Sequence, residues 1–229
     1  MTRILLVGHG RMGALVEQLA PDYDCEIAGI VTEENGVAGI AGAPDATDVA
    51  VDFTTANAIL ANMQALAERR INVVIGTTGW QDHEPHVRAV AERHGIGVLA
   101  ASNFSIGLHI FRTAVAQASA GFAAQAAVGA WIHEAHHIAK KDAPSGTALT
   151  LKDAMIGAGY ARPIDVSSTR AGSIPGTHTV GFDGPSETVT LTHTVRDRAV
   201  FARGALEVAR WLVGKRGWFT MDDYLKEHS

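Results

Sequence analysis

The fold of the first part of this chain is indicated by the stretch Arg3-Ile-Leu-Leu-Val-Gly-His-Gly-Arg-Met-Gly13. Its apolar run ends at Val7 and is typical of a buried strand, and helical spacing of apolar residues begins soon afterwards. Between them, Gly8, Gly10 and Gly13 have the spacing of a turn that binds the phosphates of a dinucleotide. The stretch therefore predicts a strand, a phosphate-binding turn and a helix, while a purely structural turn remains the alternative.

Strand and helix patterns alternate through the first hundred residues. Short apolar runs predict the strands, and apolar residues at helical spacing predict the helices. The predicted strands cover residues 3–7, 25–31, 49–53, 73–75 and 97–100. Of the predicted helices, one begins at about residue 11, the next has Thr54 or Thr55 as its N-cap, and the third covers 84–93. This order predicts an α/β fold with a Rossmann-like, doubly wound parallel sheet. Such sheets bind ligands beyond the carboxyl ends of their strands.

The pattern changes after Phe104. Residues 172–185 are rich in proline and glycine and are predicted to be loops. The other predicted elements are helices over about 106–119 and 145–158, strands at 128–134 and 188–194, and a last amphipathic helix containing Leu206, Val208, Trp211 and Leu212. The strand at 188–194 alternates threonines with apolar residues, which is typical of a mixed or mostly antiparallel sheet with one buried face.

Composition narrows the class of protein. Of the 229 residues 47% are hydrophobic, which is enough for a substantial core, and the net charge of −5 does not favour nucleic acid as a partner. The single cysteine, Cys25, excludes an internal disulfide and suits a reducing compartment. Neither a signal peptide nor a membrane span is predicted. We therefore expect a cytoplasmic protein that acts on a small molecule.

Three further segments suggest contacts to a nucleotide. Glu33 follows Gly13 by twenty residues, at the end of the second strand, where a carboxylate can accept hydrogen bonds from ribose hydroxyls. The segments 76–79 (Gly-Thr-Thr-Gly) and 101–104 (Ala-Ser-Asn-Phe) follow later strands at the same edge of the sheet. Their small polar side chains suit a nicotinamide or a ribose, although each segment alone could be an ordinary turn.

The densest group of chemically active side chains is Glu134-Ala-His-His-Ile-Ala-Lys-Lys-Asp-Ala-Pro-Ser-Gly-Thr147. Its last residues predict the start of a helix, whose free amides, with the Ser145 and Thr147 hydroxyls, would bind a carboxylate. Lys140 and His137 could balance a second carboxylate. The histidines do not form an i, i+4 pair on a predicted helix and have no nearby cysteine, so no metal site is predicted.

These motifs together resemble the 4-hydroxy-tetrahydrodipicolinate reductase family, also called dihydrodipicolinate reductases. The resemblance covers nearly the whole chain, and the segment Glu134–Thr147 is its most specific part. The other matching segments are 8–13, 52–54, 76–79, 103–105, 170–172, Arg198 and 201–205.

The resemblance implies two domains and a homotetramer. A dinucleotide-binding domain of residues 1–104 would be completed by residues 205–229, and an inserted α/β domain of residues 105–204, with a mixed and mostly antiparallel sheet, would bind substrate and form the tetramer. His136 and Lys140 correspond to catalytic positions. Substrate-binding positions correspond to His137, Ser145, Gly146 and Thr147, and cofactor-binding positions to Val7, Gly8, His9, Gly10, Arg11, Met12, Glu33, Gly76, Thr77, Thr78, Ala101, Ser102, Asn103 and Phe104.

The implied reaction is the reduction of a cyclic imine dicarboxylate with NAD(P)H in the diaminopimelate route to lysine. Glu34 stands where some members have an arginine for the 2′-phosphate, and Thr55 where some have another arginine, so NADH is the expected preference and NADPH remains possible. Ile138 and Ala139 replace residues that are basic in many members. The alternatives are another small-molecule dehydrogenase and a non-enzymatic NAD(H)-responsive protein.

Overall fold

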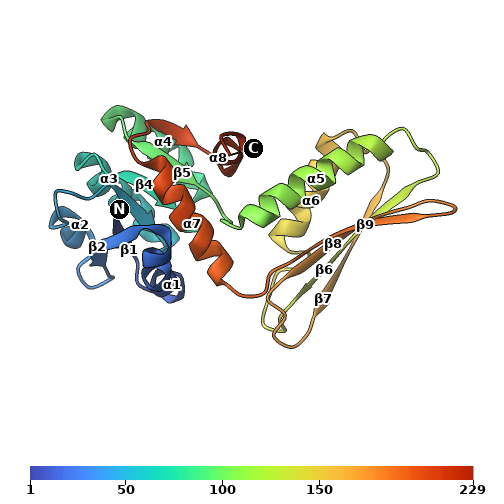
Figure 1. Ribbon diagram of the computed structural model, residues 1–229, viewed down its shortest axis with the longest axis horizontal. Coiled ribbons are helices and arrows are strands. Elements are labelled where there is room, and N and C mark those ends of the chain that lie inside the picture. Colours follow the sequence, from blue (N-terminus) through green and yellow to red (C-terminus); the bar gives the residue numbers. More distant parts are fainter. Residues whose placement is uncertain (229) are drawn as a thin grey trace. The chain divides into compact units, whose positions relative to one another are not determined.

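The computed structural model describes residues 1–228 and divides them into two compact units (Figure 1). The first unit comprises Met1–Ile106 and the part of the chain from Ala199 onward, and the second comprises Gly107–Arg198. The chain thus returns to the first unit at residue 199, whereas the predicted boundary is 205. The earlier return has a simple cause: helix α7 (Ala199–Leu212) packs as a whole on α1 and on the parallel sheet.

The first unit is built on a six-stranded parallel sheet with the strand order β10-β5-β4-β3-β1-β2. The strands are β1 (Thr2–Val7), β2 (Cys25–Val31), β3 (Val49–Asp52), β4 (Asn72–Ile75), β5 (Gly97–Ala100) and β10 (Gly217–Phe219). The predicted doubly wound parallel sheet is confirmed, and the C-terminal segment adds a strand to it that the sequence did not predict.

Helices cover both faces of this sheet because alternate residues of its strands point to opposite sides. Leu5 and Val7 pack with one set of helices, and Ile4 and Leu6 with the other. The first set is α2 (Gly36–Ala41), α3 (Ile59–Glu68) and α4 (Glu84–His94), and the second is α1 (Arg11–Leu19), α7 and α8 (Met221–Lys226). Short 3₁₀ turns at Ala20–Tyr23, Ala56–Ala58 and Gln81–His83 complete the unit.

One predicted helix start in this unit is wrong. The helix α3 begins at Ile59 with Ala58 as its N-cap, not at Thr54 or Thr55. A 3₁₀ turn intervenes, and Thr55 precedes it without a side-chain cap. The Thr54 hydroxyl instead donates to the buried carboxylate of Asp52, which holds this side chain away from the helix start.

The second unit has a four-stranded sheet with the order β7-β6-β8-β9. Its elements are α5 (Ile106–Phe122), β6 (Gly129–His136), α6 (Gly146–Gly157), β7 (Ile164–Arg170), β8 (Thr177–Asp183) and β9 (Thr188–Thr194). Strands β6 and β7 are parallel and the other pairs are antiparallel, so the predicted mixed, mostly antiparallel sheet is confirmed. Two local predictions are wrong, since residues 177–183 form a strand rather than a loop and β6 continues to His136.

The two faces of this second sheet differ. On one face Ile132, Val180 and Phe182 pack against the apolar sides of α5 and α6, such as Phe111 and Leu151. The other face carries Trp131, His133 and a series of threonines, among them Thr179 and Thr192, whose hydroxyl oxygens are 3.0 Å apart. The period of two along each strand separates the apolar set from the polar set.

Cys25 is buried in the first unit as a free cysteine. Burial raises the pKa of its thiol to about 11, so the residue behaves as a small core side chain rather than as a nucleophile. Within residues 1–228, no helix has the length and apolar character that a membrane crossing requires.

Candidate active site

The glycine turn after β1 is shaped by close contacts. A Cβ at Gly13 would lie 2.2 Å from the carbonyl oxygen of Gly8, so only glycine lets α1 pack this close to the turn. Gly8 has a φ of +91°, and its Cβ would lie 2.6 Å from the oxygen of Phe53. Gly10 is different: it is the N-cap of α1, and a Cβ there would meet no atom within 4 Å. The helix start is thus open to an approaching phosphate, which fits a bound dinucleotide.

A buried carboxylate orders the neighbouring loops. Asp52 is 1% exposed at the end of β3. It accepts hydrogen bonds from the amide and hydroxyl of Thr54 at 2.9 and 2.6 Å, from the Thr77 hydroxyl at 2.9 Å and from Asn62 at 3.0 Å. The side chain of Thr77 therefore supports the edge of the sheet from inside, whereas Thr78 is exposed. Sequence reasoning did not assign a role to Asp52, although it lies in the segment 52–54 that carries part of the family resemblance.

The predicted ribose-binding segment is an exposed turn. Thr32 donates its amide to the Asn35 side chain at 2.8 Å, and Glu33 and Glu34 lie between them with exposed side chains. Residues 32–41 contain no lysine or arginine. Arg11, at the start of α1, is exposed as well.

The segment after β5 is partly a core element. Phe104 is 2% exposed and packs edge-on against Phe53, with ring centroids 6.1 Å apart, so only its backbone can face a ligand. Asn103 accepts a hydrogen bond from the Ser105 amide at 2.8 Å, and Ser102 is exposed. The backbone of these residues continues the edge formed after β1, β3 and β4, since Ala101 donates its amide to Ile75 and Gly76 donates to Asp52. The predicted cofactor segments thus meet at one edge of the sheet.

In the second unit, Glu134 lies at the centre of the other predicted group. It is fully buried and pairs with Arg170 through two hydrogen bonds, 2.6 Å to Oε1 and 2.8 Å to Oε2. His136 Nδ1 lies 2.5 Å from Oε2, and the Ser145 amide donates to Oε1 at 3.2 Å. The last residues of β6 and β7 and the start of α6 therefore converge on one carboxylate.

Ser145 and His178 are the buried neighbours of this group. The Ser145 hydroxyl accepts from the Ala148 amide at 3.2 Å, as the N-cap of α6, and lies 3.0 Å from Nε2 of His178. Ser145 is 2% exposed, so its hydroxyl is engaged inside the protein and contributes to a carboxylate site by capping the helix. Gly146 is exposed and Thr147 half-buried, and these are the residues of this turn that can face a ligand.

Lys140 lies on the loop between β6 and α6, four residues after His136. Its Nζ is 2.7 Å from Oδ1 of Asp142, and its side chain is 23% exposed. The carbonyl of Asp142 accepts a hydrogen bond from Arg170 at 2.6 Å, which connects this loop to the Glu134 group. His137 is half-buried beside it, and Ile138 is exposed.

Burial and charge set the protonation states of this group. Burial alone would raise the pKa of Glu134, but hydrogen bonds from Arg170, Ser168 and His136 lower it to about 2. Burial lowers the pKa of His136 despite the nearby Glu134 carboxylate, and it lowers that of His178 to about 4. Both imidazoles are therefore neutral at pH 7, and the group offers an acceptor nitrogen beside a cationic lysine.

Arg170 and His178 were not among the predicted site residues. Strand register places both residues next to the Glu134 group, because His136 pairs with Arg170 across β6 and β7, and Glu134 pairs with His178 across β6 and β8. Arg170 opens a short segment that carried the family resemblance, and His178 is a histidine on a buried strand face, so both had weak signals. No group of three or more His, Cys, Asp or Glu residues among residues 1–228 is arranged to hold a metal ion.

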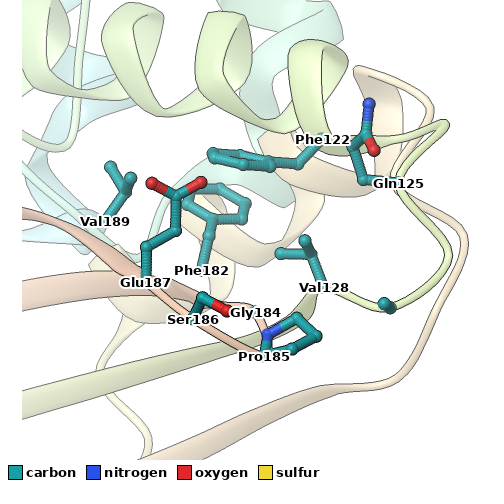
Figure 2. Close-up of a pocket in the computed structure, with 10 residues that line it drawn as sticks. Phe122, Gln125, Val128, Phe182, Gly184, Pro185, Ser186, Glu187 and Val189 are labelled. Atoms are coloured by element: carbon teal, nitrogen blue, oxygen red, sulfur yellow. The ribbon is translucent and has the colours of Figure 1, made fainter.

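A cavity of about 340 Å³ lies at the other end of the second sheet, beside the turn between β8 and β9 (Figure 2). The stacked rings of Phe122 and Phe182, with centroids 4.8 Å apart, line it together with Glu187. Of the described residues that line it, none belongs to the predicted site. This hollow is therefore separate from the Glu134 group.

Comparison with known families matches both units. Residues 2–104 match the family model described as "Dihydrodipicolinate reductase, N-terminus", and residues 107–225 match "Dihydrodipicolinate reductase, C-terminus". The two matched ranges meet within a few residues of the division between the compact units.

Similar proteins agree with this family match. A 4-hydroxy-tetrahydrodipicolinate reductase of Xanthomonas euvesicatoria is 38% identical over 93% of this chain and 92% of its own length. One from Methanoregula boonei is 35% identical over 98% of both chains. The solved structure of a dipicolinate-bound dihydrodipicolinate reductase from Paenisporosarcina has the same fold, with a TM-score of 0.79 at 20% identity, over 96% of this chain and 97% of that one.

Proposed function

This chain belongs to the dihydrodipicolinate reductase family, and we propose that its two units divide the reaction between nucleotide binding and substrate binding. It is an oxidoreductase that reduces 4-hydroxy-tetrahydrodipicolinate in the diaminopimelate route to lysine. The observation that supports the division is the Glu134 group, which places His136, Lys140 and the start of α6 together in the second unit.

The first unit would hold the nicotinamide nucleotide through the glycine turn and the loops after β2, β4 and β5. The open helix start at Gly10 suits the pyrophosphate, and Glu33 suits the ribose hydroxyls. The bound nucleotide supplies a hydride to the substrate ring. We assign these contacts to the backbone of 7–12, 76–78 and 101–104 and to the side chains of Glu33 and Thr78.

The second unit would hold and protonate the substrate. One ring carboxylate would accept from the amides of Gly146 and Thr147 at the start of α6 and from the Thr147 hydroxyl. The other would lie near Lys140 and His137. Hydride addition leaves an electron-rich ring that needs a proton, and Lys140 is the cationic donor at this place. His136, neutral at pH 7, offers Nε2 as an acceptor.

The function is tested with the purified protein and its substrate, made fresh from pyruvate and aspartate semialdehyde by condensation. We expect NADH to be oxidised in step with substrate consumption. Folded protein that oxidised neither NADH nor NADPH would contradict the assignment and favour a nucleotide-responsive binding protein. Dipicolinate, the ligand named in the Paenisporosarcina structure, serves as a non-reacting probe of the dicarboxylate site in a calorimetric titration.

NADH is the proposed preferred nucleotide. The two exposed carboxylates Glu33 and Glu34 would oppose a 2′-phosphate, and residues 32–41 offer no cation to bind it. We expect kcat/KM to favour NADH several-fold or more, equivalent to roughly 1 kcal/mol. Glu34→Arg should narrow the difference by adding a phosphate partner. Side-by-side kinetics that showed a clear preference of the unmodified protein for NADPH would contradict this interpretation.

We also propose that the protein assembles as a homotetramer in the cytoplasm. The face of the second sheet that carries Trp131, His133 and the threonines is opposite the face that packs against α5 and α6, and we expect it to contact another copy. The family resemblance supports the tetramer, and the lone buried cysteine suits a reducing compartment. Light scattering that gave the mass of a 24.1 kDa monomer would exclude the tetramer.

A further inference from the structure

One buried carboxylate connects both predicted catalytic residues. Glu134 contacts His136 directly, and its partner Arg170 also donates from Nη2 to the carbonyl of Asp142 at 2.6 Å. The carboxylate of Asp142 in turn holds the Lys140 ammonium at 2.7 Å. The histidine and the lysine therefore depend on the same ion pair for their positions.

The contacts of Glu134 assign one proton on His136. An ionised carboxylate has only acceptors, so the 2.5 Å contact to Nδ1 requires that this nitrogen carry the hydrogen. No described residue donates to or accepts from Nε2 of His136. Gly176 leaves room beside it, because a Cβ at that position would lie 3.1 Å from Nε2. A larger residue at 176 would crowd this nitrogen, so Nε2 is the ring nitrogen that glycine keeps accessible and that makes no hydrogen bond to a described residue.

We propose that Glu134 is a positioning residue for the reductase reaction: it keeps the proton of His136 on Nδ1, so that Nε2 stays available as an acceptor for the hydroxyl of the substrate. Arg170 and the Ser145 amide fix the carboxylate from the other side. Because Ser145 also caps α6, the orientation of the histidine is coupled to the helix start that would bind the substrate carboxylate.

A purely structural ion pair is the competing explanation. Glu134 and Arg170 could neutralise each other without His136, and buried ion pairs often contribute little net stability. The two explanations differ in one observable, since only positioning controls which ring nitrogen of His136 carries the proton.

Glu134→Gln tests the position of that proton. Arg170 and the Ser145 amide both donate hydrogen bonds to Oε1 of Glu134. In the glutamine variant, the amide oxygen should therefore occupy the position of Oε1. The amide nitrogen then occupies the place of Oε2, loses the contact to Arg170 Nη1 and donates to Nδ1 of His136. We expect nitrogen-15 NMR of histidine-labelled protein at neutral pH to show Nδ1–H in the unmodified protein and Nε2–H in the variant. The His136 signals are assigned by their loss in His136→Gln.

Kinetics give the second measurement, which rests on the proposed reductase function. Glu134→Gln should lower kcat roughly 10- to 100-fold and leave the KM for NADH within about twofold, because the nucleotide site lies in the other unit. Glu134→Asp keeps the acceptor charge and should restore the Nδ1–H form and part of the rate. Glu187→Gln is the matched control, since it removes a carboxylate of the same unit, one that lines the distant cavity.

Each outcome decides the proposal. An Nε2–H tautomer in the unmodified protein would overturn it whatever the variants do, and so would a folded Glu134→Gln protein with normal kcat. If Glu134→Gln does not fold, the unmodified protein and Glu134→Asp still give the tautomer. If the unmodified protein shows no turnover, the proposed function fails, whereas the NMR result on the free protein stands by itself.

Discussion

Lys140→Ala is expected to lower kcat on the order of 10²-fold or more, since the change removes both a proton donor and a cation at the dicarboxylate site. The structure supports the lysine as the donor rather than the histidine. Burial lowers the pKa of His136, so at pH 7 its imidazole is neutral and its Nε2 accepts rather than donates. Lys140 is only 23% exposed and is held by Asp142, which keeps the ammonium close to the site before substrate arrives.

Two matched variants separate this role from a general loss of charge or binding. Lys141→Ala makes the same substitution one residue later, at an exposed side chain, and should leave kcat and KM near their normal values. Thr147→Val removes a hydroxyl from the proposed carboxylate site and should mainly raise the KM for the substrate. Steady-state kinetics in which Lys140→Ala kept a near-normal kcat would move the proton-donor role to His136 or to water.

Gly204→Ala is expected to destabilise the first unit by roughly 3 kcal/mol or more. Gly204 lies in the middle of α7, where it is fully surrounded, and a Cβ there would lie 1.8 Å from the carbonyl oxygen of Phe104. A backbone atom cannot turn away as a flexible side chain can, so the helix or the loop after β5 must move. That loop is one of the proposed nucleotide contacts, and a weaker affinity for NADH should accompany the loss of stability.

Urea unfolding followed by tryptophan fluorescence measures this effect, because Trp80, Trp211 and Trp218 all lie in the first unit. The control is Gly121→Ala, the same change near the end of α5, where a Cβ would meet no atom within 4 Å. This control should leave stability unchanged or raise it by up to about 1 kcal/mol, as alanine favours helix. Equal unfolding curves for Gly204→Ala and the unmodified protein would show that α7 can shift without cost.

Much of the proposed site was predictable because its residues are close together in the sequence. His136, Lys140 and Thr147 fall within one segment of fourteen residues, and the last residues of that segment indicated a helix start near Ser145. Their partners were not predictable in the same way. Arg170 is 36 residues from Glu134, and no local pattern states which strand will lie beside β6.

The glycine turn, the alternation of strands and helices in the first unit and a helix start near Ser145 could be predicted from the sequence, because each depends on spacing over a few residues. Tertiary structure alone decided which side chains meet. The register of β6 with β7 and β8 sets Arg170 opposite His136 and His178 opposite Glu134, and a shift of one residue would turn each to the other face of the sheet. Burial then fixed their protonation, since removal from water favours neutral imidazoles while Arg170 keeps Glu134 ionised.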